Sequence, residues 1–213
     1  MQPTYRVNAS RRIVLIAAAA WLLAVGSGFA RLWSYSLAPG VAADAPPIWP
    51  PDSPIPRQTG VPLLVMIAHP ECPCTRASIG ELSRLVADSP VALSVAVVFV
   101  MPRDRVAAWQ ASDLWRSAVA IPSVSAFADA DGREARRFGS ATSGQTFLYD
   151  GRGRLRFSGG ITAARGHAGD NAGRHAILAI LDRTATDEAR TPVFGCPLFT
   201  PRDKCAHGGP LCT

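Results

Sequence analysis

Apolar residues form one long run near the N-terminus and several short runs further along the chain. Residues 13–30, IVLIAAAAWLLAVGSGFA, contain no charged side chain and are about long enough to cross a bilayer as a helix. Basic side chains favour the cytoplasmic side of a membrane, and three arginines stand within residues 1–12. The pattern predicts a cytoplasmic N-terminus at 1–12, a transmembrane anchor at 13–33 and an exported remainder.

A cleaved export signal is the alternative interpretation of this run, with Ala30 before the cleavage site. The run is long for the apolar part of such a signal, and Arg31, Leu32 and Trp33 form a poor flank for cleavage. An uncleaved anchor is therefore preferred. Both interpretations export the five cysteines of the chain to a compartment that permits disulfides.

Residues 34–60 carry seven prolines. Proline fixes its own backbone angle and lacks an N–H, so it is unsuited to helix interiors and to central strands. The segment is therefore predicted to be a semi-rigid, extended linker that holds a folded domain away from the membrane.

Short apolar runs predict alternating strands and helices over residues 61–184. Unbroken apolar runs are typical of strands buried on both faces, and a turn at 150–153 predicts a hairpin. The predicted strands are 63–68, 91–100, 124–128, 146–149 and 154–157. Apolar residues at helical spacing predict helices over 76–88, 104–118 and the stretch from an N-cap at Asp170 or Asn171 to Arg183. This order predicts an α/β fold, a central mixed sheet flanked by helices, followed by a cysteine-bearing tail at 185–213.

Charge changes this picture little. The formal net charge is +6, but the arginines are scattered and no basic stretch is interleaved with aromatic residues. Nucleic-acid binding needs a basic patch, so no nucleic-acid partner is predicted.

The candidate chemistry lies in residues 69–78, HPECPCTRAS, between the first predicted strand and the first helix. Cys72 and Cys74 flank Pro73, and a helix N-terminus stabilises a thiolate, the nucleophile of disulfide exchange. A disulfide across one intervening residue closes a small, strained ring and is easily reduced. The pair is therefore predicted to be redox-active; buried, inert cysteines are the alternative.

These residues carry a resemblance to a known family. The stretch LLVMIAHPECPCTRASIGELSRLV, residues 63–86, resembles the active-site segment of thioredoxin-fold proteins, in which a core strand precedes a cysteine pair that opens a helix. Residues 127–161 are similar to the second half of membrane-tethered thioredoxins of the TlpA and ResA type. With SGGITAARGHAGDNAGR and VFGCPL, the chain most resembles the RedB-like group of exported bacterial thioredoxin-like proteins.

The resemblance implies roles for individual residues. Cys72 matches the attacking cysteine and Cys74 the resolving one, although the usual motif is shortened to Cys-Pro-Cys. Gly144, followed by Gln145, stands where the family has a cis-proline that presents backbone to the substrate and helps to keep metal off the two sulfurs. The implied active-site rim consists of His69, Pro73, Gly144, Gln145, Gly160 and His167.

The implied function is a membrane-anchored thiol–disulfide oxidoreductase in a bacterial inner membrane, with its domain facing the periplasm. It needs no small-molecule cofactor, and its partners are exported thiol or disulfide proteins. The alternative is a copper-handling, metallochaperone-like protein, because Cys72 and Cys74 with His69 or His167 would form a soft nitrogen–sulfur site.

The tail adds Cys196, Cys205 and Cys212. Small exported segments commonly use disulfides as staples, so a structural bridge between two of these three is expected. Cys196 has apolar neighbours on both sides in VFGCPLF. Docking of Cys196 onto the domain as a third thiol is the alternative.

Overall fold

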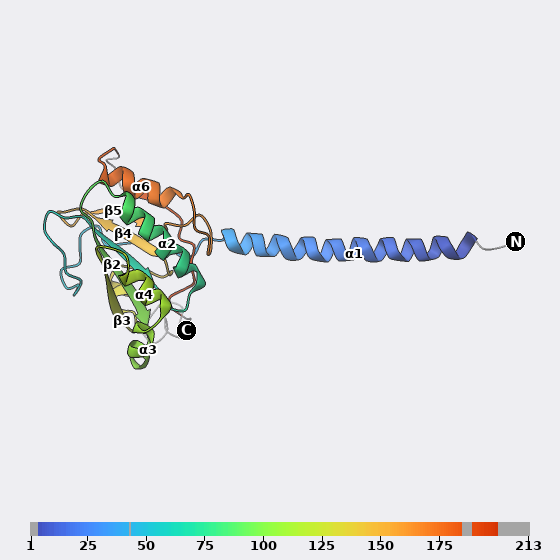
Figure 1. Cartoon of the computed structure of the whole chain (residues 1–213), viewed down its shortest axis with the longest axis horizontal. Coiled ribbons are helices and arrows are strands. Elements are labelled where there is room, and N and C mark those ends of the chain that lie inside the picture. The colour runs from blue at the N-terminus through green and yellow to red at the C-terminus, as the bar shows by residue number, and fades with distance from the viewer. Residues whose placement is uncertain (1–3, 43, 185–188, 200–213) are drawn as a thin grey trace, which may run out of the picture. The chain divides into compact units, whose positions relative to one another are not determined.

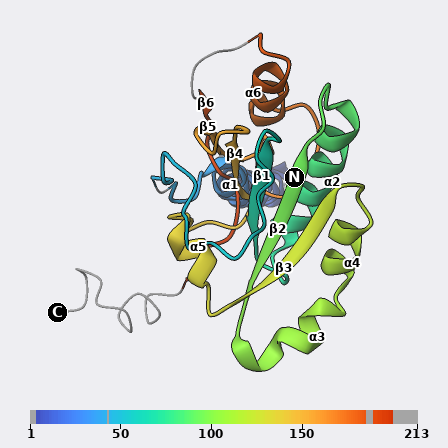
Figure 2. The same cartoon turned by 90° about the vertical axis from the view of Figure 1, so that its left-hand side faces the viewer.

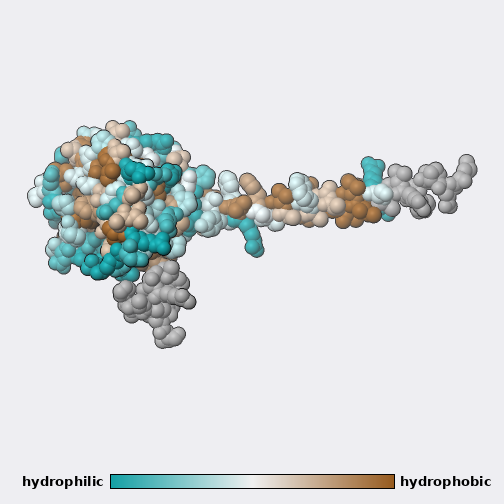
Figure 3. Space-filling model, turned by 60° about the horizontal axis from the view of Figure 1, so that its bottom comes forward, coloured by the Kyte–Doolittle hydropathy of each residue, from teal (hydrophilic) through white to brown (hydrophobic). Residues whose placement is uncertain are grey.

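The computed structural model describes residues 4–42, 44–184 and 189–199, and the chain divides into two compact units, Met1–Leu37 and Ala38–Thr213. The first unit contains one helix, α1 (Thr4–Leu37). Within its stretch Ser10–Leu37, an 18-residue window has a mean hydropathy of 2.2, and none of that window is buried. Figure 3 shows apolar residues along this helix. The predicted long apolar N-terminal helix is confirmed, and its length and composition fit an anchor or an export signal.

The second unit is built on one mixed sheet of six strands in the order β3-β2-β1-β4-β5-β6. Figure 1 shows strands β2, β3, β4 and β5 of this sheet together with helices α2 and α4. The strands are β1 (Leu63–Ala68), β2 (Ser94–Met101), β3 (Val124–Ala130), β4 (Gln145–Tyr149), β5 (Leu155–Gly159) and β6 (Ala189–Arg190). Strands β1, β2 and β3 are parallel, β4 is antiparallel to β1 and β5, and β6 is parallel to β5. The expected mixed sheet is confirmed.

Strand β1 lies at the centre of the sheet. All six of its residues are buried, and Val65 pairs with Ala96 of β2 on one side and Phe147 of β4 on the other. Alternate residues of the strand therefore enter two separate apolar cores, one on each face. This arrangement explains why the sequence of β1 is apolar throughout.

Helices cover both faces of the sheet (Figure 2). The helices are α2 (Pro73–Asp88), α3 (Val106–Gln110), α4 (Asp113–Val119), α5 (Arg133–Arg137) and α6 (Ala172–Leu181), with a 3-10 turn η1 (Arg103–Arg105) before α3. Apolar side chains of α2, α4 and α6 pack into one core, and α5 packs into the other. Asn171 caps α6 by accepting a hydrogen bond from the N–H of Arg174 at 2.8 Å, as predicted.

Two helical regions differ from the prediction, and the two-residue strand β6 was not predicted either. The expected single helix 104–118 is divided into η1, α3 and α4, because Ser112 accepts a hydrogen bond from the N–H of Trp115 and starts a new helix as its N-cap. The short helix α5 was missed. It has only five residues, and its charged sequence gives no apolar periodicity to detect.

The proline-rich segment differs from the expected linker, because residues 44–60 pack on the domain. Trp49 packs against Phe138 and Tyr149, with ring centroids 5.3 and 5.2 Å apart, and Ile55 is buried. The N–H of Trp49 donates to the carbonyl of Gly153 at 2.8 Å. The prolines exclude a helix, but the apolar side chains between them cover the second face of the sheet.

We expect Trp49→Ala to destabilise the domain by about 2 kcal/mol, because removal of this half-buried ring leaves its two ring partners, Phe138 and Tyr149, more exposed. Urea unfolding of the full chain in a mild detergent measures this change. The matched control is Ile48→Ala, because Ile48 is 60% exposed and its replacement should cost less than about 0.5 kcal/mol. Equal, small effects of both variants would contradict the packing of this segment.

Candidate functional site

The site begins at the carboxyl end of β1. After Ala68 the chain turns so that Cys72 is the N-cap of α2 and Pro73 occupies the first turn of the helix, a position that suits proline because no N–H is needed there. Cys74 follows as the second helical residue. The predicted location of the thiol pair at the junction between strand and helix is confirmed.

Hydrogen bonds fix the turn that carries Cys72. The carbonyl of His69 accepts from the N–H of Cys72 at 3.1 Å and from the hydroxyl of Thr75 at 2.9 Å. Ser143, from the loop before β4, accepts from the N–H of His69 at 2.9 Å and lies 3.0 Å from the hydroxyl of Thr75. Hydrogen bonds between buried polar groups therefore connect the turn to the neighbouring loop. Leaving such groups without partners would destabilise the fold.

A third thiol completes the site. The Sγ atoms of Cys72 and Cys196 lie 2.9 Å apart, and the three sulfurs of Cys72, Cys74 and Cys196 all lie within 4.8 Å of one another. All three are free cysteines. Cys72 is buried, whereas Cys74 and Cys196 are partly exposed. Cys205 and Cys212 lie outside the described residues, so the expected bridge within the tail stays a prediction.

Backbone pairing holds Cys196 at this position. The carbonyl of Cys196 accepts from the N–H of Ser143 at 2.9 Å, and the N–H of Leu198 donates to the carbonyl of Ala141 at 2.9 Å. Thr142 and Pro197 form an antiparallel bridge between these two bonds. Residues 196–198 therefore lie as a short strand beside residues 141–143, directly before β4.

Two glycines permit this close approach. A Cβ atom on Gly195 would stand 1.8 Å from the carbonyl oxygen of Ser143, a contact no side chain can make. Gly144 has φ +89°, in the left-handed region that favours glycine, and its N–H donates to the carbonyl of Ile67 at 2.7 Å. Proline cannot adopt this backbone or make this bond. Gly144 is therefore fixed beside the end of β1 by a hydrogen bond that proline could not make.

Electrostatics favour one thiolate in this cluster, at Cys72. Burial alone would raise the pKa of Cys72, but hydrogen bonds from Cys196 and from the backbone around Cys74 and Thr75 outweigh burial and lower it. Burial and the charge of Cys72 raise the pKa of Cys74. Burial and the hydrogen bond to Cys72 raise the pKa of Cys196 to about 12. Cys196 is therefore a protonated donor to the Cys72 thiolate.

Arg165 supplies positive charge to the same cluster. Its guanidinium lowers the pKa of both Cys74 and Cys196, although this effect is smaller than that of burial. The same side chain donates to the carbonyl of Gly195, next to Cys196, and to the carbonyl of Ala38 at 3.2 Å. Arg165 therefore acts on the site in two ways, through its charge and by holding the tail segment.

A buried carboxylate orders the loop that carries Arg165. Glu81, on α2, is fully buried and accepts from the N–H of Gly169 at 2.7 Å and from the side chain of Asn171 at 3.1 Å. It also forms ion pairs with Arg84 and Arg174. A buried carboxylate needs such partners. These contacts hold residues 165–171, RGHAGDN, as a loop against α2.

Neither candidate histidine belongs to the group of ligand atoms that lie within 4.8 Å of one another. Nδ1 of His69 accepts from the N–H of Glu71 at 3.2 Å, and its ring packs edge-on against Trp109. Burial lowers the pKa of His69, so its neutral form is favoured. His167 is exposed, with Nδ1 2.9 Å from the carbonyl of Arg165. Among the described residues, the only clustered metal-ligating groups are the three cysteines.

The remaining predicted rim residues, Gln145 and Gly160, are buried in neighbouring segments. Gln145 is fully buried at the start of β4, where it pairs with Ile67. Gly160 lies against the tail, and a Cβ atom there would stand 2.6 Å from the carbonyl oxygen of Pro192. Sequence reasoning gave no role to Arg165 and left Cys196 open. The apolar residues around Cys196 in VFGCPLF were the available signal, since Val193 and Leu198 are both buried.

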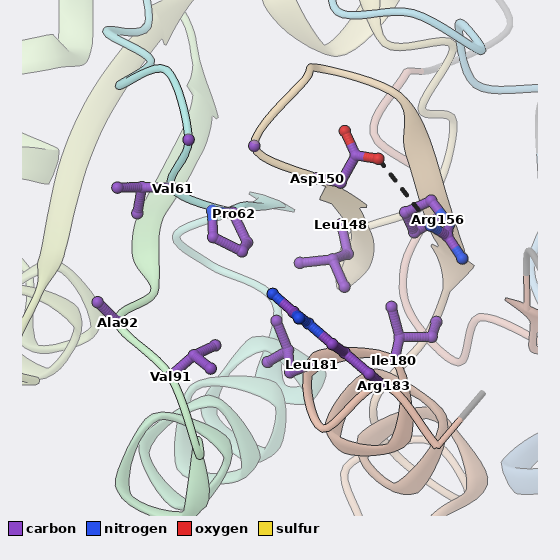
Figure 4. Close-up of a pocket in the computed structure, with 12 residues that line it drawn as sticks. Val61, Pro62, Val91, Ala92, Leu148, Asp150, Arg156, Ile180, Leu181 and Arg183 are labelled. Carbon is purple, nitrogen blue, oxygen red and sulfur yellow. Dashed lines mark ion pairs between the residues drawn. The ribbon is translucent and has the colours of Figure 1, made fainter. Parts of the chain in front are cut away.

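A cavity of about 380 Å³ lies at the other end of β1 (Figure 4). Val61 and Pro62, which precede β1, line it together with Leu148 and Leu181, and Arg183 extends across it. The thiols follow the carboxyl end of β1, so this cavity is separate from the candidate site. Two of the polar side chains that line it, Asp150 and Arg156, form an ion pair with each other.

Comparisons with known proteins bear on the fold. No protein-family model matches the chain, and no curated protein matches it. Among solved structures, an uncharacterized conserved protein from Geobacillus kaustophilus is 16% identical with a TM-score of 0.56, over 78% of this chain and 94% of the other. A hypothetical protein from Sinorhizobium meliloti 1021 is 21% identical with a TM-score of 0.53, over 78% of this chain and 97% of the other.

A secreted Mycobacterium tuberculosis disulfide oxidoreductase, described as homologous to E. coli DsbE, overlaps less well. It is 15% identical with a TM-score of 0.39, over 59% of this chain and 83% of the other. At such identities the likenesses concern the fold alone. The order of the strands and the cysteine pair at the start of α2 are those expected of a thioredoxin-like domain.

Proposed function

We propose that this chain is a membrane-anchored thiol–disulfide oxidoreductase whose reacting thiolate is Cys72. The observation that carries the proposal is the cluster of three free thiols at the N-terminus of α2, with the Cys72 and Cys196 sulfurs 2.9 Å apart. Disulfide exchange needs one thiolate and a neighbouring thiol that can pair with it. The lowered pKa of Cys72 and the raised pKa of Cys196 supply these two states.

The partners in this proposal are exported proteins that carry thiols or disulfides. Cys72 is 2% exposed, so a partner reaches the cluster through the partly exposed Cys74 or Cys196. No small-molecule cofactor is needed, because electrons pass between sulfur atoms.

The proposed location is a bacterial inner membrane, with the domain facing the periplasm. The apolar stretch Ser10–Leu37 supports an anchor, and the arginines before it support a cytoplasmic N-terminus. Membership of the RedB-like group is part of the same proposal and rests on the resemblance of the sequence motifs.

A second candidate function is the binding of a soft metal ion such as monovalent copper. The specific observation in its favour is that three sulfurs lie within 4.8 Å of one another, since thiolate ligands select soft metals. The ligand set differs from the one expected from the sequence, because Cys196 takes the place of a histidine. Against this candidate, the raised pKa values of Cys74 and Cys196 oppose the deprotonation that metal binding requires.

We expect Cys72→Ala to lower disulfide exchange by at least about 100-fold, because the substitution removes the reacting thiolate. The measurement is the rate at which the full chain in detergent exchanges disulfides with glutathione and with a reduced, unfolded protein. Ser83→Ala, an exposed position on the same helix, is the control and should keep the wild-type rate.

Copper content of the same preparations separates the two functions. Exchange that depends on Cys72, in a protein purified without copper, supports the oxidoreductase. Stoichiometric copper that is lost in Cys72→Ala, with no exchange in the wild type, would instead support metal binding.

The acidity of Cys72 is testable through the ultraviolet absorbance of its thiolate in the reduced chain. Because hydrogen bonds lower the pKa of Cys72, its thiolate should form at a lower pH than that of an ordinary cysteine, near about 8.5. Cys196→Ala removes the side-chain donor and should shift this step to higher pH. Cys74→Ala keeps its backbone N–H but removes a weaker side-chain contact with Cys72, so it should shift the step less than Cys196→Ala does; identical steps in both variants would contradict the role given to Cys196.

A further inference from the structure

We propose that the redox disulfide of this chain is Cys72–Cys196, with Cys196 as the sulfur that meets the partner and Cys72 as its internal counterpart. The inference rests on the proposed thiol–disulfide function and changes which cysteines carry it. The sequence motif pairs Cys72 with Cys74, and the docked tail offers Cys72 a different partner.

The positions of the sulfurs favour a Cys72–Cys196 bond over a Cys72–Cys74 bond. Cys72 and Cys196 come from separate segments that lie side by side, and their sulfurs are already 2.9 Å apart, compared with about 2.05 Å in a disulfide. Cys72 is the N-cap and Cys74 is the second residue of α2. The Cys74 sulfur also lies within 4.8 Å of Cys72, but a Cys72–Cys74 bond would close a small, strained ring across the single residue Pro73.

The segment around Cys196 is held on both sides. Residues 196–198 pair with residues 141–143, and the carbonyl of Val193 accepts from the N–H of Gly40 at 2.7 Å. Thr191 donates its hydroxyl to the carbonyl of Gly160 at 2.8 Å, and Arg165 donates to the carbonyl of Gly195. The backbone is thus fixed in the position that a Cys72–Cys196 bond needs, and little ordering remains to oppose the bond.

The sulfurs of Cys72 and Cys196 differ in their accessibility to a partner. Cys72 is buried, and Cys196 is partly exposed beside a hollow lined by Gly40, Thr142 and Arg165. A partner thiolate can therefore reach Cys196 more easily than Cys72. Cys72 in turn is the better leaving group, because the start of α2 stabilises its thiolate and a more acidic thiol leaves faster.

These features define the exchange steps. A thiolate of a partner dithiol attacks Sγ of Cys196 in the Cys72–Cys196 disulfide, a bond forms between the partner sulfur and Cys196, and Cys72 leaves as a thiolate. The second partner thiol loses its proton and displaces Cys196, whose sulfur takes up a proton. The partner is oxidised to a disulfide, the protein gains two electrons, and an exported disulfide carrier must reoxidise it. Cys74 remains a thiol throughout.

Mapping of the disulfides tests this assignment directly. The full chain in detergent is equilibrated with oxidised glutathione, quenched with acid, alkylated and digested for mass spectrometry. We expect the peptide pair that contains Cys72 and Cys196 as the main disulfide, in the wild type and in Cys74→Ala. A main bond between Cys72 and Cys74, or between Cys196 and another tail cysteine, would overturn the inference.

A glycine variant tests the role of docking without removing a thiol. Gly195→Ala places a Cβ atom against the carbonyl oxygen of Ser143 and should slow formation of the Cys72–Cys196 bond by at least about tenfold. Gly80→Ala on α2 is the matched control, since a Cβ atom there meets nothing within 4 Å. Equal rates in Gly195→Ala and Gly80→Ala would contradict a docked, pre-positioned Cys196.

The exchange assay distinguishes failure of this inference from failure of the proposed function. If the wild type exchanges, and Cys196→Ala loses exchange at least about 100-fold while Cys74→Ala keeps it, the inference is supported. If exchange persists in Cys196→Ala and is lost in Cys74→Ala, the function stands and the inference is wrong. If the wild type itself does not exchange, the proposed function fails.

Discussion

The complete burial of β1 is the constraint on which the arrangement of this domain depends. All six residues of the strand are apolar and buried, so β1 must have a strand on each side and a covered face above and below. Its parallel neighbour β2 and antiparallel neighbour β4 satisfy the backbone on both sides. The chain leaves β1 at Ala68, at the carboxyl end of the parallel strands, and must turn there to cross over into α2. Cys72 lies in that turn.

The same constraint brings the third thiol to the site. Because β4 is antiparallel to β1, its first residue, Gln145, lies next to the carboxyl end of β1. The loop before β4 therefore passes beside Cys72 and exposes backbone groups of residues 141–143, to which residues 196–198 bind. A segment more than a hundred residues away in the sequence thereby presents a sulfur to the start of α2.

The sequence predicted the parts of the structure that depend on local patterns. Unbroken apolar runs located β1 and β2, and helical spacing with an Asn171 cap located α6. The location of Cys72 between β1 and α2 followed from the same pattern, although α2 begins at Pro73 and not at residue 76 as predicted. The break in the helix around Ser112 was missed, because a single side-chain cap competes there with a continuous apolar periodicity.

Packing between distant segments could not be derived in the same way. Prolines in residues 44–60 excluded helix and central strand, but nothing local shows that Trp49 packs on Phe138. Cys196 was visible as a docking candidate through its apolar neighbours, while its partner depended on the register of pairing with Ser143. Arg165 was missed because its role arises from a loop that the buried Glu81 fastens to α2.

The central claim is that this cluster of thiols forms a reversible redox disulfide and not a structural crosslink. The most direct measurement is the reduction potential of the full chain, obtained by equilibration in glutathione buffers with the Cys72 disulfide quantified at each ratio. Stabilisation of the Cys72 thiolate favours the reduced form, so we expect one two-electron transition above about −230 mV. A potential below about −300 mV, typical of structural disulfides, or the absence of any transition would contradict the account.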